Sequence, residues 1–424
     1  MLKDRTKIRD AHSKIGQKIS IYGWVEDKRV VGGVAFLIIR DTTGKIQVTI
    51  KRDQASELFA LATDIPRQST VKATGIVREF NNIIEIIPDS IKVLSTAQHP
   101  LPIDPTGRTE ASIHKLIQNR PLSLRIPEIN AIFRLRSITK QVIREFFISK
   151  GYIEIDTPKI IATATEGGAN LFEVDYFGRS AYLAQSPQLY KEQLTMGFDG
   201  VFEIAQFYRA EKSHTRRHLT EFTSVDLEVA YADYNDVMDI LEELMKYVFS
   251  EVPKRGSAEL EILQYKPPPP PSEVPRITYD EALEVVRAGG VDIEWGDDID
   301  GDALDVLARK YPGFYFIVDW PWDSKPFYIR RKGRLSESFD LMIGRLELSS
   351  GGTREHIYEE LKKNISEKGL NVESFEYHTR FYKYGMPPHA GFGLGLDRLM
   401  TVLAGRENIR EVVLYPRDPE TITP

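Results

Sequence analysis

Residues 209–228 gather basic, acidic and histidine side chains in a pattern that suits a bound polyanion. Apolar, strand-like residues precede and follow this segment, so we predict that it is the long loop and second strand of a β-hairpin. The guanidinium groups of Arg209 and Arg217 suit phosphate oxygens, and the carboxylate of Glu211 suits the donor groups of a base or an amine. A solvated hairpin tip is the alternative interpretation.

A second candidate for anion binding is the glycine-rich segment 391–395, which precedes an apolar helical pattern over residues 396–403. Arg398 falls in the first turn of that helix. Its positive charge adds to the helix dipole at the N-terminus and favours a phosphate there. A glycine-rich match of this kind is weak by itself, because many turns before helices carry glycines.

The composition is that of a globular protein, with 424 residues, 42% hydrophobic and 28% charged. It predicts two or three domains. The sequence holds no apolar run of about 18 residues and no signal-peptide pattern, so we expect a cytoplasmic protein with no membrane partner. Zero cysteines exclude disulfides, thiol catalysis and cysteine-based zinc sites. The net charge of −6 does not exclude a nucleic-acid partner, because a local basic groove is sufficient.

Residues 18–95 read as five short strands with one short helix after the third, which fits an OB-fold β-barrel. A small SH3-like barrel is the alternative. We assign residues 1–97 to this barrel and the proline-rich, polar residues 98–127 to a hinge. On its second and third strands, Phe36 and Gln47 are placed to contact single-stranded nucleic acid, unless Phe36 is simply a core residue.

A second domain is predicted over residues 128–424. It begins with an amphipathic helix to about residue 150, followed by a strand that leads to Pro158. The polyproline run Pro267–Pro271 is a rigid spacer within an insertion at about residues 255–312, which we expect to pack beside the main sheet. Residues 338–348 are expected to form one strand.

Three segments in this order resemble the signature motifs of class II aminoacyl-tRNA synthetases. Motif one covers about residues 130–160 and ends in Pro158, motif two covers about residues 202–231, and motif three covers about residues 389–404. With the N-terminal barrel, the chain resembles the subgroup for aspartate, asparagine and lysine. The resemblance implies an α+β chain, in which an OB-fold anticodon-binding barrel is joined by a hinge to a catalytic domain with an antiparallel sheet flanked by helices.

Residues 185–191 resemble the corresponding segment of archaeal-type aspartyl-tRNA synthetases, in which the lysine faces the side-chain carboxylate of the substrate. The resemblance implies that ATP activates L-aspartate to aspartyl-adenylate, which is transferred to the 3′ end of tRNA(Asp). Charging of tRNA(Asn) is left open, because Glu26 stands where these enzymes often carry Trp or His. A solvated helix position is the alternative interpretation of Lys191.

The resemblance also implies roles for individual residues. Aspartate is expected to contact Glu166, Gln188, Lys191, Arg209, Ser350 and Arg354. ATP is expected to contact Arg209, Glu211, Arg217, His218, Leu219, Glu347, Gly395, Asp397 and Arg398, with Arg209 and Arg398 as the catalytic pair. Mg²⁺ is expected on Glu347, Ser350 and Asp340, the anticodon on Arg29, Phe36 and Gln47, and the interface of a homodimer at Pro158.

Three alternatives to an aspartate–tRNA ligase stay open. An asparagine–tRNA ligase shares the motifs, although Lys191 argues against it, because an unpaired lysine beside an amide is costly. An amino-acid ligase related to asparagine synthetase would not need the barrel, and a non-catalytic RNA-binding protein would not need the site. Two departures from the subgroup are Asp397, in place of the usual glutamate, and the more basic stretch 212–217.

Overall fold

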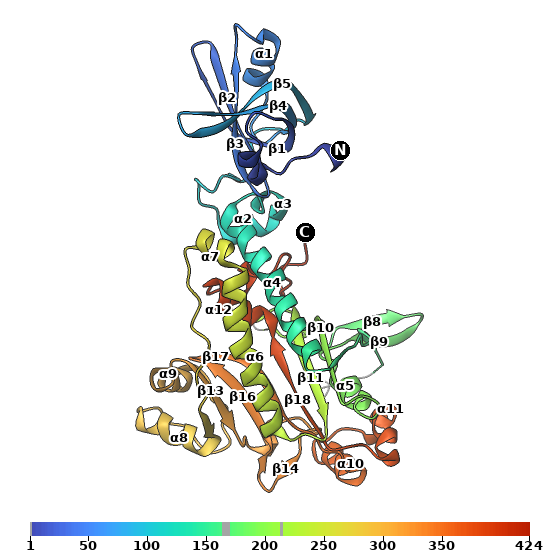
Figure 1. The fold of residues 1–424 in the computed structure, drawn as a ribbon. Coiled ribbons are helices and arrows are strands. Elements are labelled where there is room, and N and C mark those ends of the chain that lie inside the picture. Colours follow the sequence, from blue (N-terminus) through green and yellow to red (C-terminus); the bar gives the residue numbers. More distant parts are fainter. Residues whose placement is uncertain (1, 163–169, 213–214) are drawn as a thin grey trace. The chain divides into compact units, whose positions relative to one another are not determined.

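The computed structural model describes residues 2–162, 170–212 and 215–424. They form two compact units, one of residues up to 112 together with 121–126, and one of residues 113–120 together with 127–424 (Figure 1). The residues assigned to the hinge are divided between these units. They include helices α2 (Ile113–Gln118) and α3 (Arg120–Ser123).

The first unit is a closed barrel with the strand order β1-β2-β3-β5-β4. Its elements are β1 (Lys18–Val31), β2 (Val34–Asp41), β3 (Gly44–Lys51), α1 (Ser56–Asp64), β4 (Thr70–Phe80) and β5 (Ile83–Ser95). Along β2, half-buried and buried residues alternate, because successive side chains of a strand point to opposite faces. The helix follows the third strand, so the predicted OB-fold arrangement is confirmed.

The second unit is built on an eight-stranded sheet with the order β12-β13-β16-β17-β18-β11-β10-β6. Its strands are β6 (Ile153–Glu154), β10 (Gly200–Tyr208), β11 (Glu221–Ala230), β12 (Arg276–Thr278), β13 (Phe314–Val318), β16 (Ser338–Ile343), β17 (Leu346–Thr353) and β18 (His389–Gly395). The inner strands pair antiparallel, as predicted. The two edge strands, β6 and β12, pair parallel with their neighbours.

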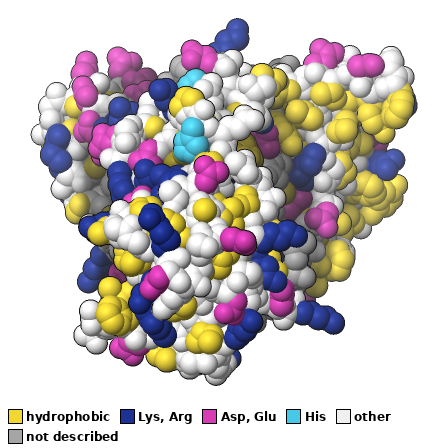
Figure 2. Space-filling view, turned by 90° about the horizontal axis from the view of Figure 1, so that it is seen from above, with side chains coloured by type: hydrophobic (Ala, Val, Ile, Leu, Met, Phe, Trp, Pro, Cys, Tyr) yellow, Lys and Arg dark blue, Asp and Glu magenta, His cyan; other side chains and the backbone are white. Residues whose placement is uncertain are grey.

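Two smaller sheets accompany the main sheet. One consists of β7 (Ile160–Ile161), β8 (Glu173–Tyr176) and β9 (Arg179–Leu183), and the other of β14 (Arg331–Lys332) and β15 (Leu335–Ser336). In the part of the chain that the structure describes, no helix has the length and apolar character needed to span a bilayer. Acidic and basic side chains are intermixed on the face shown in Figure 2.

Amphipathic helices cover the apolar face of the main sheet. They are α4 (Pro127–Ser149), α6 (Tyr234–Arg255), α7 (Ser257–Leu263) and α12 (Leu396–Ala404), and their apolar stripes form one core with the sheet. Helix α4 starts with a proline, which suits a first helical position, and α6 starts with a capping box between Asp233 and Asp236. The remaining helices are α5 (Gln188–Leu194), α8 (Tyr279–Ala288), α9 (Gly301–Lys310), α10 (Tyr358–Glu367) and α11 (Glu376–Thr379).

The opposite face of β11 is buried as well, although it is polar. Val225 and Leu227 point into the core, whereas Ser224, Asp226 and Glu228 alternate with them and are all less than 10% exposed. Buried carboxylates need internal partners, because an unpaired buried charge is strongly unfavourable. This polar face is where the candidate site lies.

Two local expectations were wrong. Residues 338–348 are not one strand, because Gly344 adopts a left-handed turn (φ 53°) that folds β16 back onto β17 and places Asp340 opposite Ser350. The insertion at about residues 255–312 does not simply pack beside the sheet. Its strand β12 extends the sheet through β13, while α8 and α9 form their own small core around Tyr279.

Candidate functional site

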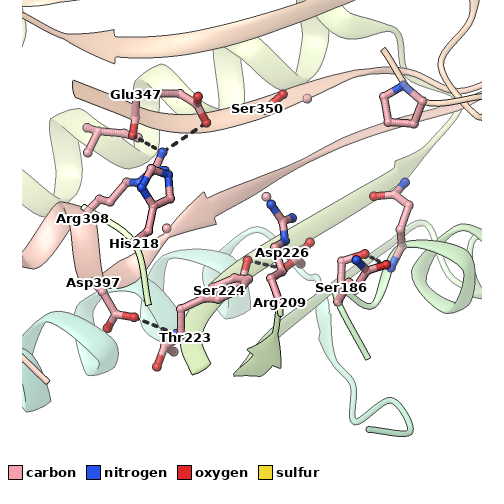
Figure 3. A pocket seen from close by; sticks show the side chains of 18 of the residues that line it. Ser186, Arg209, His218, Thr223, Ser224, Asp226, Glu347, Ser350, Asp397 and Arg398 are labelled. Atoms are coloured by element: carbon pink, nitrogen blue, oxygen red, sulfur yellow. Dashed lines mark hydrogen bonds and ion pairs between the residues drawn. The ribbon is translucent and has the colours of Figure 1, made fainter. Parts of the chain in front are cut away.

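A cavity of about 380 Å³ opens on the polar face of β11, β17 and β18 (Figure 3). It collects most of the residues that the sequence singled out, from elements far apart in the chain. Those in its lining are Gln188, Arg209, Glu211, Arg217, His218, Leu219, Glu347, Ser350, Arg354, Gly395, Asp397 and Arg398. Figure 3 shows Arg398 and His218 beside Glu347, and Arg209 close to Asp226.

One corner of the cavity is rich in cationic donors. The Arg398 guanidinium donates to the Glu347 backbone oxygen at 2.9 Å and lies 3.4 Å from His218 Nε2. Burial, followed by the charge of Arg398, lowers the pKa of His218, which favours the neutral imidazole. Burial and the nearby Arg345 and Arg398 also lower the pKa of Arg217. Clustered guanidinium groups of this kind are stabilised by a bound phosphate.

Arg209 lies at the other end of the same wall. It follows β10, and its backbone nitrogen donates to the Thr220 oxygen across the hairpin at 2.9 Å. Its guanidinium carbon lies 5.3 Å from the centre of the Phe222 ring, a cation–π contact that orients the side chain. The hairpin predicted from the charged segment is therefore present, and two of its cations, Arg209 and Arg217, line a cavity.

Asp397 lines the cavity, but both of its carboxylate oxygens are engaged by the protein. Oδ2 accepts from the Thr223 backbone nitrogen at 2.8 Å, and Oδ1 lies 2.6 Å from the Arg136 guanidinium. Arg136 also donates to Thr223 Oγ1 at 2.9 Å. These contacts fasten the start of α12 to α4 and β11, and so position Arg398. A direct contact of Asp397 with ATP stays a prediction.

A buried network of four charged residues lies at the other end of the cavity. Lys191 on α5 is 1% exposed, and its Nζ lies 3.0 Å from Asp226 Oδ1 and 3.4 Å from Glu228 Oε2. Arg354 donates to the two oxygens of Glu228 at 2.9 and 3.2 Å. Burial lowers the pKa of Arg354, but the charge of Glu228 outweighs it and raises the pKa overall.

This network decides between the two interpretations of Lys191. A solvated helix position is wrong, because the side chain is fully buried and paired. Lys191 nevertheless does not itself line the cavity; the lining residue in front of it is Asp226. Arg354 and Gln188 do line the cavity.

The glycines of segment 391–395 serve to make room for this network. They lie in β18, opposite the acidic residues of β11. A Cβ atom at Gly391 would lie 2.2 Å from Glu228 Oε2, and one at Gly393 would lie 3.3 Å from Asp226 Oδ1. Glycine is needed here for close approach within a sheet, rather than for a turn that binds phosphate.

The three residues predicted to bind a metal do not all face the cavity. Glu347 and Ser350 line it, but Asp340 pairs with Lys325 Nζ at 2.9 Å and is absent from the lining. Partial desolvation raises the pKa of Glu347, although its side chain is 48% exposed; the charge of Arg398 opposes this rise and that of Asp340 adds to it. No group of three or more His, Asp or Glu within the described ranges is arranged to hold a metal ion.

Sequence reasoning missed several residues of the site. Asp226, Glu228, Lys325 and Tyr328 were not singled out, yet three of them line the cavity and Glu228 holds its charge network. The available signal was the pair of acids that alternate with apolar residues in β11. Glu166 lies outside the described residues, and Pro158 is exposed on the surface.

The three residues predicted to contact an anticodon share one outward face of the barrel. Arg29 lies opposite Phe36 on the neighbouring strand, and Phe36 lies opposite Thr49, two residues from Gln47. Phe36 is half-buried and does not belong to the core, so its ring is available on that face. The Gln47 amide donates to Glu85 at 3.1 Å.

Glu26 is buried next to this face. Glu26 forms an ion pair with Arg40 and lines a second cavity of about 290 Å³, together with Gln47 and Lys45. The charge of Glu26 is therefore compensated within the barrel. On the neighbouring face, the amide of Gln47 presents a polar edge and the ring of Phe36 presents a stacking surface.

Comparison with known proteins agrees with the geometry of both units. The family "tRNA synthetases class II (D, K and N)" matches residues 112–419, and the family "OB-fold nucleic acid binding domain" matches residues 19–94. The chain is 45% identical to an aspartate–tRNA(Asp/Asn) ligase of Archaeoglobus fulgidus, over 96% of this chain and 97% of the relative. It is 44% identical to an aspartate–tRNA(Asp) ligase of Pyrococcus furiosus, over 96% of this chain and 97% of the relative.

Among solved structures, the asparaginyl-tRNA synthetase from Pyrococcus horikoshii complexed with asparaginyl-adenylate superposes with a TM-score of 0.92. The two chains are 32% identical, and the match covers 99% of each. The fold of the barrel and the fold of the sheet with its helices are thus both shared with that structure.

The Asp397 contacts generate a prediction on stability. Replacing Asp397 with alanine leaves the Arg136 guanidinium, which is 15% exposed, without its 2.6 Å partner, and we expect a loss of about 3–5 kcal/mol in the free energy of unfolding. Urea denaturation measures the change. The control is Glu407→Ala, which breaks a surface pair with Arg216 and should change nothing measurable. Equal stability of both variants would contradict the positioning role.

Proposed function

Because the chain belongs to the class II tRNA synthetases of the aspartate, lysine and asparagine group, we propose that it is an aspartate–tRNA ligase. It activates L-aspartate with ATP and transfers the aspartyl group to the 3′ end of tRNA(Asp). The observation that carries the proposal is one cavity with cationic donors for phosphate at one end and buried cations for a carboxylate at the other. The reaction serves translation, so a cytoplasmic location belongs to the same proposal.

In the first step the α-carboxylate of aspartate attacks the α-phosphorus of ATP, and pyrophosphate leaves. The reaction needs no protein nucleophile, so the side chains act by positioning and by neutralising charge. Arg209 would hold the α-phosphate, and Arg217, His218 and Arg398 the β- and γ-phosphates. Glu211 would accept from the adenine amino group. In the second step the terminal ribose hydroxyl of the tRNA attacks the adenylate.

The charge network suggests how aspartate is accommodated. Lys191 and Arg354 are balanced by Asp226 and Glu228, so the network is neutral without substrate. The α-ammonium group of aspartate would pair with Asp226, which lines the cavity. Asp226 would then pair less strongly with Lys191. Lys191 could therefore attract the side-chain carboxylate of the substrate, which would lie beside Arg354. Asparagine has no side-chain carboxylate that could pair with Lys191 in this way.

Divalent metal use is expected of this family, and we propose Mg²⁺ as the ion. Glu347 and Ser350 supply two oxygen donors in the cavity, which fits an ion that is held mainly by phosphate oxygens and water. Asp340, which is paired with Ser350 on the neighbouring strand, could join them only by leaving Lys325. When bound, the ion neutralises phosphate charge.

We further propose that the chain forms a homodimer through the surface around Pro158. The apolar stripe of α4 is buried within this chain, so it is not free to serve a partner. Next to the exposed Pro158, however, Ile153 and Ile160 are 45% and 50% exposed. These residues lie on the short strands β6 and β7, just before and after Pro158 in the chain, and an apolar patch that a second copy covers would account for their exposure.

An asparagine–tRNA ligase is the second candidate, because a solved asparaginyl-tRNA synthetase shares the fold over nearly the full length. The buried Lys191 and Arg354 argue for aspartate. The test is pyrophosphate exchange with purified enzyme and each amino acid in turn. We expect exchange with aspartate at least about 100-fold above asparagine, since a site built for a charged group rejects the neutral analogue strongly. Better exchange with asparagine would contradict the proposal.

Lys191→Ala tests the recognition of the substrate carboxylate. We expect its KM for aspartate to rise roughly 10- to 100-fold, the effect of one charged hydrogen bond, while ATP binding by titration calorimetry survives. The matched control is Lys246→Ala, which removes a helical surface pair with Glu242. Unchanged aspartate activation in Lys191→Ala would remove Lys191 from the site.

Phe36→Ala tests the barrel face. Loss of one stacked base weakens binding by about 1–3 kcal/mol, so we expect the KM for tRNA to rise roughly 5- to 100-fold. Exchange without tRNA serves as the internal control and should be unaffected. Charging of both tRNA(Asp) and tRNA(Asn) measures the effect and also establishes which tRNAs the wild type accepts. A normal KM for tRNA would exclude the stacking role.

A further inference from the structure

A second buried cluster lies directly behind the wall that α5 gives to the cavity. Its centre is Glu192, which is fully buried, as is His378. Gln188 and Glu192 are four residues apart on α5 and therefore lie on the same side of the helix. The Gln188 amide nitrogen donates to Glu192 Oε1 at 2.6 Å.

The second oxygen of Glu192 is held by other elements. The Tyr382 hydroxyl donates to Oε2 at 2.7 Å, and His378 Nε2 lies 3.3 Å from the same oxygen. His389 Nε2 lies 3.9 Å away. Four side chains from α5, the segment after α10, and β18 therefore converge on one carboxylate.

Glu192 is charged in this setting. Burial by itself raises the pKa of the carboxyl group, but His378 and His389 outweigh burial and hold the pKa well below its usual range. The three close partners also fit an ionised group, because each can present a hydrogen to it. A charged carboxylate accepts hydrogen bonds and cannot donate them.

This chemistry fixes the orientation of the Gln188 amide. Its nitrogen must face Glu192, so its oxygen is turned away from Glu192. Gln188 lines the cavity, next to Ser186 and Asp226. An amide oxygen there is an acceptor, and the substrate group that offers hydrogens at this end of the cavity is the α-ammonium group of the amino acid.

We propose that Glu192 is a positioning residue for amino-acid binding, which locks the Gln188 amide so that its oxygen accepts from the substrate ammonium group. The inference rests on the proposed function and deepens it. Glu192 does not touch the substrate, and it acts through Gln188. A neutral amide at position 192 could donate as well as accept, so Gln188 would then adopt both orientations.

The experiment compares four enzymes by pyrophosphate exchange and by separate titrations of L-aspartate and ATP. They are the wild type, the single variant Glu192→Gln, a double variant and the control Glu203→Gln. The double variant combines Gln188→Glu with Glu192→Gln and so exchanges the two side chains. Glu203 is likewise a buried glutamate, with Thr157 and Lys159 as partners. In the double variant the glutamate at position 188 accepts from the new amide and presents an acceptor oxygen to the cavity.

We expect Glu192→Gln to raise the KM and Kd for aspartate about tenfold or more, with values for ATP unchanged within about twofold, as for loss of one charged hydrogen bond. The double variant should regain most of the aspartate affinity, and the control should match the wild type. Rescue by the double variant separates positioning from a purely structural role, as does an unchanged affinity for ATP.

Three outcomes overturn the inference. Unchanged aspartate affinity in Glu192→Gln excludes the positioning role, as does an equal loss of affinity for aspartate and ATP. Absence of rescue in a double variant that still binds ATP excludes the role of the amide orientation. A wild type that binds ATP but not aspartate would instead remove the proposed function, on which the inference rests.

Discussion

Two buried cations share two buried carboxylates at the centre of the second unit, and the site depends on this balance. Lys191 comes from α5 and is anchored on Asp226 and Glu228 of β11, whereas Arg354 follows β17 and is anchored on Glu228. Loss of one partner from a buried pair costs about 3–5 kcal/mol, because the remaining charge stays desolvated. The network therefore fixes where α5 and the end of β17 sit on the sheet. It thereby sets one end of the cavity.

Space for these charges is created on the neighbouring strand. With any side chain at Gly391, the Glu228 carboxylate could not lie where Arg354 reaches both of its oxygens. The same strand leads into α12, whose Asp397 is bound to Arg136 and to the Thr223 backbone. One short segment thus shapes both ends of the cavity, the proposed amino-acid end through its glycines and the proposed phosphate end through Arg398.

The order of elements could be predicted well, because it depends on local periodicity and on the motif resemblance. Arg209, Glu211 and Arg398 were found in this way and do meet in one cavity. Asp226 and Glu228 were missed, because the signal that marks them, acids alternating with apolar residues, is equally typical of a strand that faces solvent. Their burial arises from α5 and the chain after β17, which are distant in sequence. The position of Asp340 opposite Ser350 depends likewise on a turn at Gly344, which the sequence pattern did not reveal.

Under the proposed function, discrimination between aspartate and asparagine would depend on the network as a whole rather than on one lysine. Lys191 is already paired with Asp226. The carboxylate of a bound substrate would therefore be stabilised by Lys191 only if another positive charge replaced Lys191 as the partner of Asp226. The substrate brings that charge in its own ammonium group. Asparagine brings the same ammonium group without the carboxylate, so Lys191 would be drawn from Asp226 with no replacement partner. An incompletely paired buried cation costs several kcal/mol, a penalty that aspartate alone avoids.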